Sequence, residues 1–131
     1  MKTNPVAVLL TIFLYACTAI DHSAAAEQMI LAEGGQTAYR VVIPAGADVS
    51  DKAVAADLAD ILKEITGATF AIVTDDSEPG EHEIVIGADN ARLAELGLAD
   101  IANDFAEGEY EIRTVGRKLI IAGGPNRGTI N

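Results

Sequence analysis

One amphipathic helix, set between strand-like runs, limits most strongly what this chain can fold into. Ser50 can cap the first free amides of this helix, and Gly67 predicts its left-handed carboxyl-terminal cap. The apolar side chains that form one stripe along the helix are Val54, Leu58, Ile61, Leu62 and Ile65. A helix with such a stripe must bury it against another element, so we expect helix packed on sheet.

Short apolar runs on both sides of the helix predict the strands of that sheet. Gly34-Gly35 is typical of a hairpin turn between the first two runs, and Gly116 lies at the turn of a second hairpin. Ile84 to Ile86 is apolar at consecutive positions, so both of its faces should be covered. The predicted strands are 29–32, 38–43, 69–73, 84–86, 110–114 and 118–122, with a second helix at 90–96. This order predicts an α+β fold, a mixed β-sheet with helices packed on it.

The first 26 residues are expected to lie outside that domain. Lys2 precedes an apolar run from Pro5 to Ala16, and Ser23 to Ala26 are small residues suited to cleavage before Glu27. The run is shorter than the roughly 20 residues of a membrane span. We therefore expect a signal peptide at 1–26, one domain at 27–131, and a secreted or periplasmic protein.

Cys17 leaves a second processing route open. Leu14 to Cys17 looks like a bacterial lipoprotein signal, although Tyr15 is bulky for one. A lipid on Cys17 would anchor the protein at the cell envelope without spanning the membrane. A short amino-terminal anchor that is never removed is the remaining alternative.

Charge narrows the range of partners. The net charge is −11, and residues 1–26 hold one basic and one acidic residue, so the predicted domain keeps it. Nucleic acids and anionic membranes bind mainly through Lys and Arg, so neither is expected as a partner, apart from membrane attachment through a lipid on Cys17.

Sequence motifs for catalysis or cofactor binding are weak. Gly123 and Gly128 have the glycine spacing of a phosphate-binding loop, but Thr129 stands where that loop needs Lys. His82 lies between two carboxylates without zinc-ligand spacing. We expect no cofactor, no metal and no catalytic residue in this segment.

Carboxylates two residues apart raise the question of glycoside hydrolysis, which uses such pairs. Glu109 and Glu111 fall on one face of a predicted strand together with Arg113. The simpler interpretation is a solvated strand face, with Tyr110 and Ile112 pointing into the core on the other side.

Three segments in order carry a family resemblance: "AVAADLADILKEITGATFAIV" (53–73), "EIVIGADN" (83–90) and "GEYEIRTVGRKLIIAGGPNRGTIN" (108–131). The series resembles the amino-terminal domain of family 67 alpha-glucuronidases. It is also similar to the small domain before the barrel in family 20 beta-hexosaminidases. The match covers nearly all of 38–131 and breaks off at Asn131, where the family has an aromatic residue.

The resemblance implies a two-layer sandwich that supports a catalytic (β/α)8 barrel placed carboxyl-terminal to this segment. It also implies that the catalytic carboxylates lie at the strand ends of that barrel. Asn126 and Arg127 are the candidates for the substrate rim at the barrel mouth, or serve as turn and helix start.

Three functions follow as hypotheses. The first is a non-catalytic accessory domain of a secreted polysaccharide-degrading glycoside hydrolase, acting on xylan or a related glycan. The second is a free-standing carbohydrate-binding module, and the third is a truncated product without an independent role.

Overall fold

The computed structural model describes residues 28–124. The predicted signal segment, Cys17 and the candidate rim residues Asn126 and Arg127 lie outside this range.

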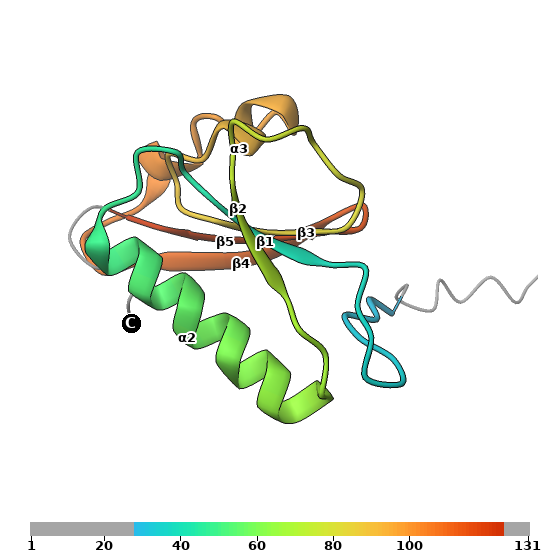
Figure 1. Ribbon diagram of the computed structural model, residues 1–131. Helices are drawn as coiled ribbons and strands as arrows, with labels where there is room; N and C mark the ends of the chain where they lie inside the picture. Colours follow the sequence, from blue (N-terminus) through green and yellow to red (C-terminus); the bar gives the residue numbers. More distant parts are fainter. Residues whose placement is uncertain (1–27, 125–131) are drawn as a thin grey trace, which may run out of the picture.

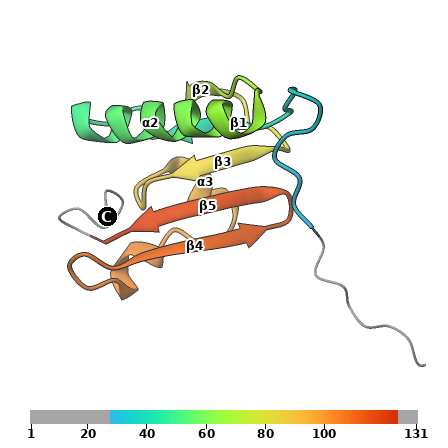
Figure 2. The ribbon, with the colours of Figure 1, turned by 90° about the horizontal axis from the view of Figure 1, so that it is seen from below.

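A mixed sheet forms the centre of the described chain, with the strand order β2-β1-β3-β5-β4 (Figure 2). Neighbouring strands run parallel except β4, which is antiparallel to β5. The strands are β1 (Arg40–Ile43), β2 (Ala71–Thr74), β3 (Glu83–Ile86), β4 (Tyr110–Val115) and β5 (Lys118–Gly123). The structure confirms the predicted fold class, a mixed β-sheet with helices packed on it.

Helices lie on both faces of the sheet (Figure 1). Helix α2 (Val49–Thr66) covers one face, while α3 (Ala91–Glu95) and the short 3₁₀ helix η2 (Ile101–Asp104) lie on the other. Gly67 ends α2 with φ of 75°, as predicted. The amino-terminal cap is Asp48 and not Ser50, because the Asp48 side chain accepts the amide of Asp51 at 2.9 Å.

The predicted first hairpin is wrong. Gly34 and Gly35 do form a tight turn, but its only pairing is an isolated bridge between Glu33 and Gln36 within the described chain. The reason is that β1 pairs with β2 on one side and with β3 on the other. No edge of β1 remains for residues 29–32, which instead lie along the core: Met29, Leu31 and Ala32 pack against it.

The core has two parts, one on each face of the sheet. On the α2 face, Ala55 and Ala59 of the helix pack on Val41 and Ile84. On the opposite face, Leu93 and Ile101 pack on Val85, Ile120 and Ala122. All four residues of β3 are buried, which confirms the prediction that both of its faces are covered.

Candidate functional site

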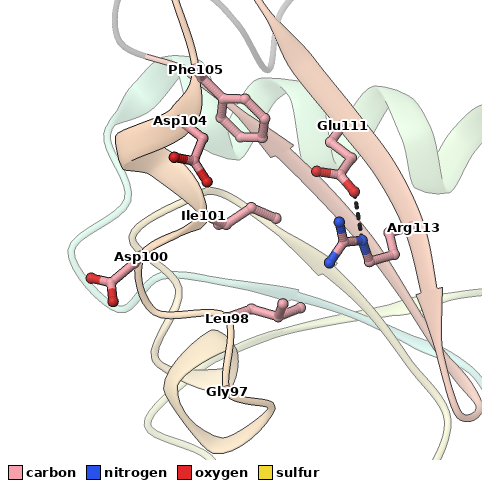
Figure 3. A pocket seen from close by; sticks show the side chains of 8 residues that line it. All are labelled: Gly97, Leu98, Asp100, Ile101, Asp104, Phe105, Glu111 and Arg113. Atoms are coloured by element: carbon pink, nitrogen blue, oxygen red, sulfur yellow. Dashed lines mark hydrogen bonds and ion pairs between the residues drawn. The ribbon is translucent and has the colours of Figure 1, made fainter.

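An acidic pocket of about 210 Å³ lies between η2 and β4 (Figure 3). It is lined by Asp100, Asp104 and Glu111 among other residues. Arg113 Nε contacts Glu111 Oε1 at 2.5 Å, and Asp100 points away from this pair. The pocket therefore does not present two free, facing carboxylates of the kind that glycoside hydrolysis uses.

Glu83 forms the densest ionic cluster of the described chain. Its carboxylate is fully buried and binds three cations, with Arg40 Nη2 at 2.7 Å, Lys118 Nζ at 2.6 Å and Arg92 Nε at 3.2 Å. The amide of Gly80 donates to Glu83 Oε1 at 2.9 Å. Burial raises the pKa of Glu83, but the hydrogen bonds from Lys118, Arg40, Gly80 and Arg92 outweigh it and bring the pKa to about 2.

The role of this cluster is structural: it holds neighbouring strands together and is not a binding site. Arg40, Glu83 and Lys118 are the first residues of the adjacent parallel strands β1, β3 and β5, so the carboxylate joins these three strands at their amino-terminal ends. Its oxygens are already occupied by donors. Sequence reasoning missed it, because Glu83 was considered only as one of the two carboxylates beside His82. The available signal was a charged residue directly before each of three apolar runs.

A second pocket, of about 530 Å³, lies at the same end of the sheet. Its polar side chains are Gln28, Tyr39, His82, Thr114 and Arg117. The rings of Tyr39 and His82 meet edge to face, with centroids 5.1 Å apart, and burial raises the pKa of Tyr39. Arg117 pairs with Glu81 at 3.0 Å. No nucleophile and base are hydrogen-bonded to each other among these lining residues.

In residues 28–124, no group of three or more His, Cys, Asp or Glu side chains is placed to hold a metal ion. Within the same range, no helix is long and apolar enough to cross a membrane.

The most unusual surface lies on the α2 face of β4. Tyr110 and Ile112 were predicted to point into the core, and this prediction is wrong, since they are 54% and 60% exposed. Ile112 pairs with Ile121 of β5, and Thr114 pairs with Leu119. Leu119 and Ile121 pack partly against the α2-side core, so their partners on β4 lie on that same face.

Helix α2 leaves this part of the sheet open. In Figure 2, α2 is drawn over β1 and β2, whereas β5 and β4 are not covered by it. Strand alternation was thus correct, and Glu111 and Arg113 do share a face. The error concerned which face is covered, and that depends on where the helices pack.

Apolar side chains also continue along the flank of α2. Ile61 and Ile65, one helical turn apart, were predicted to belong to the buried stripe, and this is wrong, since they are 53% and 75% exposed. The helix instead buries Ala55 and Ala59. In a right-handed β1-α2-β2 crossover, residues at these helical angles project towards the side of β3, β5 and β4. This flank of α2 and the α2 face of β5 and β4 are together called the open face, which comprises Ile61, Ile65, Tyr110, Ile112, Leu119 and Ile121.

Comparison with known proteins adds no identification: no family model, curated protein or solved structure matches the chain.

Proposed function

We propose that this chain is a non-catalytic accessory domain of a secreted polysaccharide-degrading glycoside hydrolase of the alpha-glucuronidase type. The ordered motif series and the signal-like first 26 residues motivate the proposal. The observation that carries it is the open face, because an accessory domain needs a surface on which its catalytic partner packs.

Physical chemistry explains why the open face supports a docking role. Isolated apolar residues on a protein surface are ordinary, but a contiguous group marks an interaction site. Burial of apolar area contributes roughly 25 cal/mol per Å², so several isoleucines covered together are a substantial driving force. The expected partner is a (β/α)8 barrel that supplies the catalytic carboxylates.

Hydrolysis assays test the non-catalytic part of the proposal. The isolated chain should release neither glucuronic acid nor N-acetylhexosamine from glycan oligosaccharides, since Glu111 is paired to Arg113 and Glu109 accepts the amide of Ala106. Release of either sugar by the chain, but not by a heat-denatured control, would refute the proposal.

The parent enzyme is tested in the coding sequence. Beyond the codon for Asn131, we expect a reading frame that encodes a (β/α)8 barrel. A frame without barrel-like sequence would favour a free-standing module or a product without an independent role.

One observation, the exposure of Tyr110, favours the alternative of a carbohydrate-binding module. Sugar-binding surfaces use exposed aromatic rings, and Tyr110 is the large exposed aromatic residue of the described chain. Calorimetry with xylan and chitin oligosaccharides would favour this alternative if binding is millimolar or tighter and is abolished in Tyr110→Ala.

A further inference from the structure

The open face has the dimensions of one helix. Neighbouring strands lie about 4.8 Å apart, so the uncovered width of β5 and β4 is roughly the 10 Å diameter of a helix. Strands of six residues are about 20 Å long, which a helix of about 13 residues matches. The exposed flank of α2 forms the wall on one side, and Tyr110 and Ile112 lie at the outer side.

Charge around this face distinguishes between possible occupants. Asp57 and Glu64 are exposed and lie one helical turn before and after Ile61, on the same side of α2. Lys52 and Lys63 fall on the opposite flank of the helix by the same geometry. The flank of α2 beside the open face is therefore apolar, and Asp57 and Glu64 form an acidic rim along it.

A second copy of the chain fits this rim poorly. Each copy has a net charge of −11, and pairing two open faces would bring their acidic rims together. A partner with basic residues beside an apolar stripe can pack its stripe on the apolar residues of the open face and pair its basic residues with Asp57 and Glu64.

We propose that the open face binds an amphipathic helix whose apolar stripe is flanked by Lys or Arg. The helix lies beside α2, across β5 and β4, and buries Ile61, Ile65 and Ile112. This inference rests on the proposed accessory role and specifies which element of the partner makes the contact.

A pair of synthetic peptides tests the proposal on the whole chain. Both are amphipathic helices of about 18 residues with the same leucine stripe, long enough to hold helical structure. One has lysines beside the stripe and the other has glutamates. In fluorescence anisotropy at low salt, the lysine peptide should bind at least about tenfold more tightly, and added salt should reduce the difference.

Matched variants locate the binding. Ile112→Glu should weaken the lysine peptide at least about tenfold, whereas Ile72→Glu, an exposed isoleucine at the far edge of the sheet, should change it less than about twofold. Asp57→Lys with Glu64→Lys should reverse the preference between the peptides. Asp100→Lys with Asp104→Lys, at η2 on the opposite face of the sheet, should not.

Three results would overturn the inference: equal binding of both peptides, no binding of either, or equal losses in Ile112→Glu and Ile72→Glu. The accessory role has separate tests, because sugar release and the downstream reading frame do not depend on these peptides.

Discussion

At the residue scale, Glu83 is the most consequential side chain in the described chain. A fully buried carboxylate held by Arg40, Arg92 and Lys118 stabilises the fold only while all partners remain, since loss of one leaves buried charge without compensation. Arg92 is itself buried and also donates to the carbonyl oxygens of Asp75 and Ser77. The cluster thus connects the loop after β2 to the amino-terminal ends of β1, β3 and β5.

Replacement of Glu83 by Gln should lower the free energy of unfolding by about 3 kcal/mol, because three cations lose their common anion. Urea denaturation measures the change. The matched control is Glu111→Gln, which breaks the more exposed pair with Arg113 and should cost less than about 1 kcal/mol. Similar losses in the two variants would contradict a structural role for the cluster.

The pH dependence of stability follows from the same group. The pKa of Glu83 is lowered from 4.5 to about 2 in the folded state, so the unfolded chain takes up the proton first as pH falls. The stabilisation is complete above about pH 4.5 and is lost between there and pH 2. The melting temperature should fall less steeply with decreasing pH across this window in Glu83→Gln than in the unchanged chain. Parallel falls in the two proteins would argue against the assignment.

At the element scale, the boundaries of α2 show how far local chemistry determines structure. The apolar stripe and the Gly67 cap predicted the helix and its end. The cap was predicted at Ser50, and this was wrong, because Asp48 has the extended backbone of a cap residue and its side chain accepts the amide of Asp51.

The cap can be tested directly. Asp48→Ala should destabilise the protein by about 1 kcal/mol, because the amide of Asp51 loses its acceptor. Ser50→Ala is the matched control, since Ser50 lies within the first turn of the helix, and it should change the urea midpoint little. A larger loss in Ser50→Ala would return the cap to Ser50.

At the scale of the whole molecule, the helices cover the sheet unevenly. The two faces of β3 are completely covered, while the α2 face of β4 is open (Figure 2). This asymmetry, and not any cluster of reactive groups, is what suggests a supporting domain that packs on a partner.

Stability measurements test whether the open face is truly solvent-exposed in the isolated chain. Ile112→Thr should change the free energy of unfolding by less than about 0.5 kcal/mol, because little buried area is lost. Ile84→Ala, at a fully buried position on the same sheet face, should cost about 2–5 kcal/mol. A comparable loss in Ile112→Thr would mean that this face is covered.

Sequence alone determined the features that depend on near neighbours in the chain. Periodicity located α2, the consecutive apolar residues of β3 indicated burial on both faces, and Gly116 marked the hairpin of β4 and β5. These patterns arise from local backbone preferences and from the repeat of each element, so a short window contains them.

Only the tertiary structure decided which strands pair and which faces are covered. β1 lies between β2 and β3, which excludes residues 29–32 from the sheet, and α2 stops short of β4, which exposes Tyr110 and Ile112. Glu83 lies 43 residues from Arg40 and 35 from Lys118 in the sequence, and these side chains meet only when the strands assemble. Pairing and coverage depend on contacts between distant segments competing for the same surface, and no local pattern records which contact prevails.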